Sequence, residues 1–167
     1  MKNLWAPWRM TYILSDKNKE EVGCIFCLGD RRVPDEDRLV LYVGKASFVM
    51  MNRFPYNNGH LLVAPIRHVP DIGNLISEER LELMDLLDHS VKILKEVMNP
   101  DGFNVGLNLG RVAGAGVEEH LHFHIVPRWN GDTNFMTVFS DIRVIPEHLK
   151  ETYRRLKVYY EKLSEER

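Results

Sequence analysis

Three histidines stand at alternating positions, His120, His122 and His124, with apolar residues between and after them. Side chains in an extended strand alternate between its two faces, so the three imidazoles are predicted to project from one face while their neighbours turn toward the core. Imidazole can serve as a nucleophile, a proton carrier or a metal ligand near neutral pH. A solvated strand face would explain one such histidine, but three of the seven in the chain favour a chemical site.

A glycine-rich segment over residues 110–116 precedes these histidines. Backbone N–H groups without neighbouring side chains can approach an anion closely, so Gly114 and Gly116 could line a phosphate site, although a flexible turn explains the glycines equally well. Glu118 and Glu119 are close in sequence, but no carboxylate is identifiable on the histidine face. The pattern therefore favours a phosphate substrate at the imidazoles over a catalytic metal.

A second pattern with chemical potential is the C-x-x-C pair Cys24 and Cys27, the two cysteines of the chain. Such a pair is compatible with half of a zinc site, with a redox dithiol and with two ordinary thiols. A structural zinc requires four nitrogen or sulfur ligands, and His68 and His120 are available to complete the set. Redox chemistry is the least favoured because no thioredoxin-like βαβ pattern surrounds the pair.

Short apolar runs bounded by turn residues predict the strands that would carry this chemistry. Five strands are expected, at residues 39–43, 47–51, 60–64, 103–109 and 120–126. Apolar residues three and four apart predict two main helices, one that Ser77 would cap and one over residues 146–164 with Pro146 at its first position. Strands grouped together, with helices between and after them, predict an α+β fold with an antiparallel sheet.

Length and composition place these elements in one domain. A chain of 167 residues suits a single core, with residues 1–37 as an irregular N-terminal arm and residues 146–164 as a C-terminal helix. The 22 basic and 24 acidic residues give a net charge of -2, so no overall field would gather a nucleic acid polymer or an anionic membrane. No apolar run has the roughly 20 residues of a membrane span, and the start lacks a secretory signal, so a cytoplasmic location is expected.

The alternating histidines, together with the residues upstream of them, resemble the histidine-triad family. The family signature is three alternating histidines followed by apolar residues, and Asn52, the segment 58–65 and Asn108 are similar to further family positions. The resemblance extends over residues 38–127 and implies a HIT-like antiparallel sheet. The chain departs from the family at residues 113–117, where many members carry a glutamine.

The resemblance implies a chemical role for each histidine. His122 would attack the α-phosphorus of a nucleotide and hold a transient nucleotidyl group. His124 would hydrogen-bond the phosphate or its bridging oxygen and help the leaving group to depart, and His120 would orient its neighbours. His60 would support the site from the adjacent strand, and Asn52 would meet the ribose hydroxyls.

Purely structural roles are the alternative for the supporting residues. His60 would then be a hydrogen-bonded, half-buried histidine and Asn52 a turn former at a strand end, and the same applies to Asn108. Substrate contacts are expected at Asn52, His60, Asn108, Gly114 and Gly116.

The same resemblance implies a structural zinc. In zinc-bearing members of the wider superfamily, two cysteines near the start join a histidine at the place of His68 and the first histidine of the triad. The implied ligands are Cys24, Cys27, His68 and His120. A divalent cation such as magnesium could accompany the substrate phosphates, and a homodimer is expected from the family and from the surplus of tryptophan and tyrosine.

The acceptor of the nucleotidyl group separates the branches of the family. A third histidine, as at His124, resembles the fragile-histidine-triad-like hydrolases and the bacterial phosphorylases, whereas sugar-phosphate transferases carry glutamine there. Residues 4–13 and 128–135 look like the bacterial diadenosine tetraphosphate phosphorylases, although their tryptophans could be packing anchors. The resemblance thus implies cleavage of dinucleoside polyphosphates by phosphorolysis or hydrolysis through a covalent nucleotidyl-histidine. A nucleoside phosphoramidase and a non-catalytic nucleotide- or zinc-binding module are the alternatives.

Overall fold

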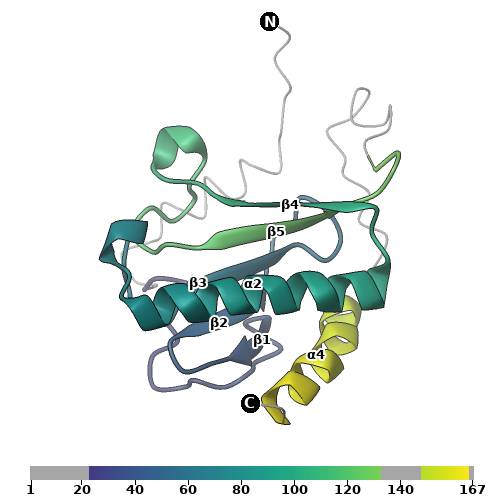
Figure 1. The fold of residues 1–167 in the computed structure, drawn as a ribbon, viewed down its shortest axis with the longest axis horizontal. Coiled ribbons are helices and arrows are strands. Elements are labelled where there is room, and N and C mark those ends of the chain that lie inside the picture. The colour runs from purple at the N-terminus through teal and green to yellow at the C-terminus, as the bar shows by residue number, and fades with distance from the viewer. Residues whose placement is uncertain (1–22, 133–147, 166–167) are drawn as a thin grey trace, which may run out of the picture.

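A computed structural model describes residues 23–132 and 148–165. The strands are β1 Val40–Val43, β2 Ser47–Met51, β3 Leu61–Pro65, β4 Gly102–Leu107 and β5 Phe123–Arg128. The helices are α2 Ser77–Met98 and α4 Leu149–Glu165, with short 3-10 turns at Ile72–Asn74 and Arg111–Ala113. The five strands form one antiparallel sheet in the order β1-β2-β3-β5-β4 (Figure 1). The predicted α+β fold is confirmed, while Pro146 and residues 1–22 of the predicted arm lie outside the described residues.

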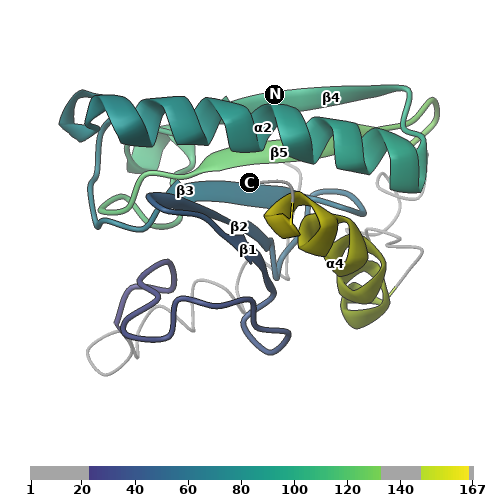
Figure 2. The ribbon, with the colours of Figure 1, turned by 60° about the horizontal axis from the view of Figure 1, so that its bottom comes forward.

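The sheet has a helical layer on one face and a chain segment on the other. Helix α2 packs on β2, β3 and β5, and α4 packs on β1 and α2 (Figures 1 and 2). Val49 and Val63 face the helices, whereas Phe48 and Leu62 face the opposite side, where residues 23–28 cover them. This alternation follows from the two-residue period of a strand, and it buries the central strands on both faces. The segment that covers the second face is therefore part of the core.

Helix α2 begins differently from the prediction. Ser77 is its first helical residue, and Ile76 occupies the cap position, where the Oε2 atom of Glu79 accepts the backbone N–H of Ile76 at 3.0 Å. Arg67 binds the same carboxylate through two hydrogen bonds, at 2.9 and 2.8 Å. The helix ends at Met98, and the residue that caps it, Asn99, adopts a left-handed conformation with φ of 46°. The prediction that Ser77 caps the helix is wrong because Ser77 is itself helical, and the residue with extended backbone before the helix is Ile76.

Strand β5 begins at Phe123, so the predicted strand over residues 120–126 is wrong for its first three residues. His120 bonds through Nε2 to the carbonyl oxygen of Pro65 at 2.8 Å, and the N–H of Leu121 donates to Val69 at 2.7 Å. These bonds turn the chain away from the sheet ladder before β5. Only His124 of the three histidines lies within the strand.

Candidate active site

His122 lies just before β5 with its side chain buried, 7% exposed. Its Nδ1 is 2.8 Å from the carbonyl oxygen of His120, and because a carbonyl only accepts, Nδ1 carries the ring proton. Burial lowers the pKa of His122 below its usual value, so the ring is neutral at pH 7 and has one proton. Nε2 therefore keeps its lone pair, which is the state that nucleophilic attack requires.

His60 and His124 form a pair whose proton positions are set by their neighbours. Nδ1 of His60 accepts from the backbone N–H of Tyr56 at 3.0 Å and from Nδ2 of Asn52 at 3.3 Å. The proton of His60 is then on Nε2, which donates to Nδ1 of His124 at 3.0 Å. His124 consequently carries its proton on Nε2, a buried atom with no hydrogen-bond partner among the described residues. A buried donor of this kind is satisfied when a ligand brings an acceptor, such as a phosphate oxygen.

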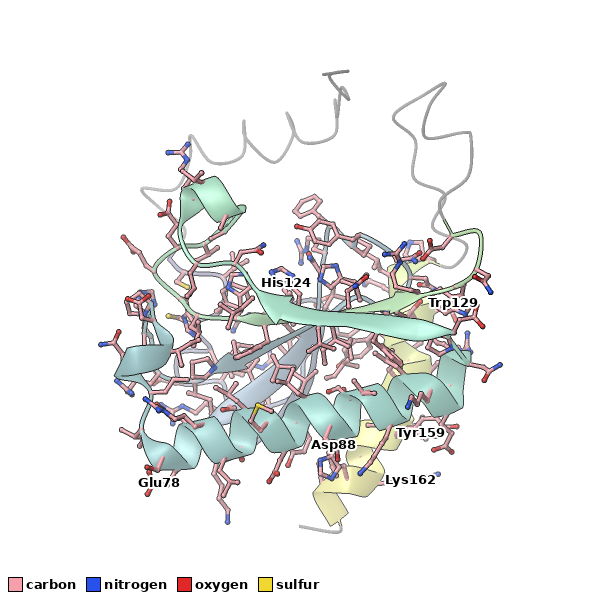
Figure 3. All side chains as sticks on the ribbon, turned by 45° about the horizontal axis from the view of Figure 1, so that its top comes forward. Glu78, Asp88, His124, Trp129, Tyr159 and Lys162 are labelled. Atoms are coloured by element: carbon pink, nitrogen blue, oxygen red, sulfur yellow. The ribbon has the colours of Figure 1, made fainter. Side chains whose placement is uncertain are left out.

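The rings of His122 and His124 are neighbours, with centroids 5.0 Å apart. His124 lies on the side of β5 that faces away from α2 (Figure 3). Burial, and to a smaller extent His122, lower the pKa of His124 to about 4. His124 is therefore neutral at pH 7 and acts as a hydrogen-bond donor, while His122 offers a lone pair.

Acid is expected to destabilise the protein through His124. The pKa of His124 is about 4 in the folded protein and 6.5 without burial, so the unfolded chain takes up the proton first as the pH falls. Stability that is complete above pH 6.5 is then lost progressively as the pH falls through 4, by a few kcal/mol at most at about 1.4 kcal/mol per pKa unit. Urea unfolding at pH 7 and at lower pH measures this loss, and it should be smaller in His124→Asn. An equal loss in both proteins would place the titration elsewhere.

The amide of Asn52 acts on its own loop and on His60. Oδ1 accepts the backbone N–H of Phe54 at 2.9 Å, which turns Nδ2 toward Nδ1 of His60. The predicted contact of Asn52 with ribose hydroxyls stays a prediction. The contact with His60 favours the tautomer of His60 that has its proton on Nε2.

The glycine-rich segment already uses part of its backbone. The N–H of Gly114 donates to Arg111 at 3.0 Å, and Nδ2 of Asn108 lies 3.5 Å from the carbonyl oxygen of Gly114. Gly114 has φ of 96°, a left-handed conformation that strains any residue with a side chain. The N–H of Gly116 has no backbone acceptor among the described residues. Of the two glycines, Gly116 is thus the one whose N–H has no such acceptor, and phosphate contacts at Gly114 and Gly116 stay predictions.

The two cysteines meet two histidines beside this site. Sγ of Cys24 lies 3.4 Å from Nδ1 of His120, and Sγ of Cys27 lies 3.3 Å from Nδ1 of His68 and 3.8 Å from Nδ1 of His120. All four candidate ligand atoms lie within 4.8 Å of one another. The structure thus brings together the four residues that were predicted as metal ligands.

This cluster has the dimensions of a tetrahedral metal site. Bonds of about 2.3 Å to sulfur and about 2.0 Å to nitrogen place such ligands about 3.6 Å apart. Nε2 of His120 donates to the carbonyl oxygen of Pro65, which directs the lone pair of Nδ1 toward the thiols. The residues therefore fit a zinc ion. Among the described residues no second cluster of this kind occurs, and magnesium stays a prediction.

Three contributions to the site were not predicted. The ring of Phe26 stacks on His122, with centroids 4.5 Å apart. Arg38 donates to carbonyl oxygens of the cysteine loop, and the ring of Tyr56 stacks on His124 at 6.0 Å. The two ring contacts join segments far apart in the chain, whereas Arg38 bonds to residues 11 and 13 positions before it. The types of these residues carry no chemical signal of their own.

Comparisons with known proteins agree with the geometry. Residues 33–131 match the HIT domain family. The AP-4-A phosphorylase of Mycobacterium tuberculosis is 40% identical over an alignment of 161 residues that covers 93% of this chain and 83% of that protein. The bis(5'-adenosyl)-triphosphatase of Dictyostelium discoideum is 35% identical over 89 residues, 53% of this chain and 59% of that protein.

A solved structure shares the fold. The structure of a Zn-bound histidine triad family protein from Mycobacterium smegmatis superposes with a TM-score of 0.61 and 25% identity. The match covers 77% of this chain and 88% of that chain. The five-stranded sheet with its two helices is thus the architecture of this group of proteins.

Proposed function

The chain belongs to the histidine-triad family, and from that premise we propose that it is an enzyme that cleaves dinucleoside polyphosphates, with diadenosine tetraphosphate as the first candidate. The observation that supports the proposal most directly is that the adjacent rings of His122 and His124 have complementary protonation states at Nε2. Nε2 of His122 has a lone pair, and Nε2 of His124 has a proton without a partner among the described residues. One ring can attack phosphorus while the other stabilises the oxygen that leaves.

The reaction follows in two displacements. Nε2 of His122 attacks the α-phosphorus, the bond from phosphorus to the bridging oxygen breaks, and its electron pair leaves with the nucleoside polyphosphate. Nε2–H of His124 hydrogen-bonds the bridging oxygen as negative charge develops there. Orthophosphate or water then attacks the same phosphorus and releases His122 in its neutral form, and an attacking water gives its proton to solvent.

The supporting residues hold this arrangement. His60 and Asn52 keep His124 in the tautomer with the proton on Nε2, and we assign Asn52 also to the ribose. Asn108 and Gly116 line the phosphate side of the site in this proposal. His120 acts through its backbone, because both of its ring nitrogens are engaged away from His122.

Phosphorolysis is the favoured second step, supported by the similarity to a protein named AP-4-A phosphorylase. Incubation with diadenosine tetraphosphate tests it, because phosphate as acceptor yields ADP and ATP whereas water yields AMP and ATP. We expect turnover to depend on added orthophosphate. AMP with or without phosphate would make the protein a hydrolase, and cleavage of adenosine phosphoramidate alone would make it a phosphoramidase. No product and no protein adduct would leave a binding module.

The metal cluster has a structural role in this proposal. Cys24, Cys27, His68 and His120 would hold zinc, and the ion would tie the segment before β1 to the sheet. A bound zinc supplies conformational stability here and takes no part in the displacement, since all four of its positions are filled by protein ligands.

We also propose a homodimer joined at β4. This strand is an edge of the sheet, and its residues Asn104, Val105 and Gly106 are exposed. An exposed edge with an apolar residue favours pairing with a second chain. Val105→Lys is expected to convert a dimer into a monomer in light scattering, whereas the matched change Val158→Lys on α4 should not. A monomeric parent protein would contradict the proposal.

We expect the protein to act in the cytoplasm. Its expected ligand is an adenine dinucleotide polyphosphate. No helix among residues 23–132 and 148–165 is long and apolar enough to cross a membrane. Two cysteines are too few for the disulfide-stapled scaffold of a small secreted protein, which supports the expected cytoplasmic location.

A further inference from the structure

The loop between the two cysteines supplies a wall of the active site. Phe26 lies inside the C-x-x-C sequence, and its side chain is 1% exposed. Its ring stacks on His122 at 4.5 Å with an interplanar angle of 26°, and it is tilted against His120 at 5.4 Å. One short loop therefore carries two metal ligands and the ring that contacts the nucleophile.

This loop is held from two sides. On one side the thiols of Cys24 and Cys27 contact the rings of His120 and His68. On the other side the guanidinium of Arg38 donates to the carbonyl oxygens of residues 25, 27 and 28, at 3.1, 2.9 and 3.4 Å. The loop also closes on itself, because the N–H of Cys27 donates to Cys24 at 3.0 Å. A displacement of the thiols would move the ring between them.

The direction of the His122 ring depends on this contact. The covalent bond to Cβ and the hydrogen bond from Nδ1 to the carbonyl oxygen of His120 hold one edge of the ring, and a tilt of the ring about that edge would displace Nε2. The flat ring of Phe26 lies along one face of the imidazole and opposes such a tilt. Attack on phosphorus requires alignment of the Nε2 lone pair, and a misplacement of about 1 Å can cost about 100-fold in rate.

We propose that Phe26 is a positioning residue for the nucleophile, and that metal binding at Cys24, Cys27, His68 and His120 fixes the ring of His122 by fixing the loop that carries Phe26. The inference rests on the proposed function, in which His122 attacks phosphorus and the cysteine cluster takes up zinc. The inference itself concerns the motion of the His122 ring, which can be measured without turnover.

The first test compares Phe26→Leu with Phe48→Leu. Both phenylalanines are buried in the same cluster, so the same substitution costs similar stability, but Phe48 has no ring contact with a histidine among the described residues. In Phe26→Leu we expect kcat to fall by about 10- to 100-fold with KM nearly unchanged. Phe48→Leu should keep the parent kcat. Equal values of kcat in the two variants would overturn the proposal.

The second test needs no turnover. The Nδ1–H proton of His122 is observable by NMR in protein labelled with ¹⁵N-histidine, and its exchange with water reports how firmly the ring is held. Zinc added to metal-free parent protein should slow this exchange severalfold. In Phe26→Leu, zinc should bind with the same stoichiometry by mass spectrometry but leave the exchange nearly unchanged. Equal slowing in both proteins, or no zinc uptake by the parent, would overturn the metal part.

Different results would disprove the proposed function and the positioning role of Phe26. A parent protein that forms no nucleotidyl adduct would disprove the proposed function, while the exchange of the ring proton would still decide the role of Phe26. A parent protein that forms the adduct at the same rate as Phe26→Leu would retain the function and overturn the inference.

Discussion

The His122→Ala protein is expected to form no nucleotidyl adduct and to lose turnover of diadenosine tetraphosphate by about 10⁴-fold or more. The reason is the arrangement of protons around His122. Its Nδ1 is bonded to a backbone carbonyl, so Nε2 has the one lone pair of a neutral ring, and no other triad ring offers the same. The measurement is intact-protein mass spectrometry after a short incubation, where the parent should gain the mass of one nucleotidyl group.

A histidine-to-alanine substitution outside the site distinguishes the loss of the nucleophile from a general loss of stability. His89 lies on α2 on the other side of the sheet, where its Nδ1 bonds to the carbonyl oxygen of Asp85. His89→Ala should keep both the adduct and the parent rate. Adduct formation by His122→Ala at the parent rate would eliminate His122 as the nucleophile and leave His124 or His120 to be reconsidered.

The other two histidines are poor substitutes for geometric reasons. Nδ1 of His124 accepts a hydrogen bond from Nε2–H of His60, so the one proton of the neutral His124 ring is on Nε2, and this nitrogen cannot attack. His120 directs Nε2 to Pro65 and Nδ1 to the thiol of Cys24. The three alternating histidines thus have different hydrogen-bond partners, and these partners favour a different role for each of them.

The sequence predicts most of the fold because its elements have strong periodic signals. The alternation of apolar residues in β2 and β3, and the three- and four-residue spacing in α2, indicate the elements and the faces that they bury. The prediction failed at the start of β5, where His120 and Leu121 bond to segments more than 50 residues earlier in the chain. Tertiary hydrogen bonds of this kind have no local signature.

The sequence also predicts the chemical residues of the site but not their supports. Residue type and spacing indicate the triad and the cysteine pair, because few structural roles require such patterns. Phe26 is a buried aromatic residue like many others, and only its stacking on His122 identifies its role. The tautomer of His60 is fixed by the backbone N–H of Tyr56, and residue type does not reveal this contact because nearly every residue has a backbone N–H.

In the glycine-rich segment, the sequence predicts a phosphate site but does not show which backbone amides are already hydrogen-bonded. Its glycines are explained by backbone conformation at Gly110 and Gly114, where φ is 80° and 96°. The N–H of Gly114 already donates to the carbonyl oxygen of Arg111. Composition therefore predicts where a phosphate could bind, and the hydrogen bonds of the folded segment show which of its amides already have an acceptor.

Removal of the metal is expected to have the second large effect, on stability. A zinc ion that bound the folded cluster and not the unfolded chain would add about 4 kcal/mol to the free energy of unfolding when free zinc exceeds its Kd about 1,000-fold. Cys27→Ser should abolish this gain, because the thiol of Cys27 lies within 3.8 Å of both His68 and His120. Urea unfolding with zinc and with a chelator, for parent and variant, measures the four states.

The comparison of these four states decides between a metal ligand and an ordinary buried thiol. For a ligand, the chelator lowers the stability of the parent to that of Cys27→Ser and leaves the variant unchanged, so the two losses are not additive. For an ordinary thiol, the chelator has no effect on either protein, and the substitution costs the same in both media. Because Arg38 holds the loop through three carbonyl oxygens, the metal-free parent should still fold at pH 7, and its loss of stability is therefore measurable as an equilibrium.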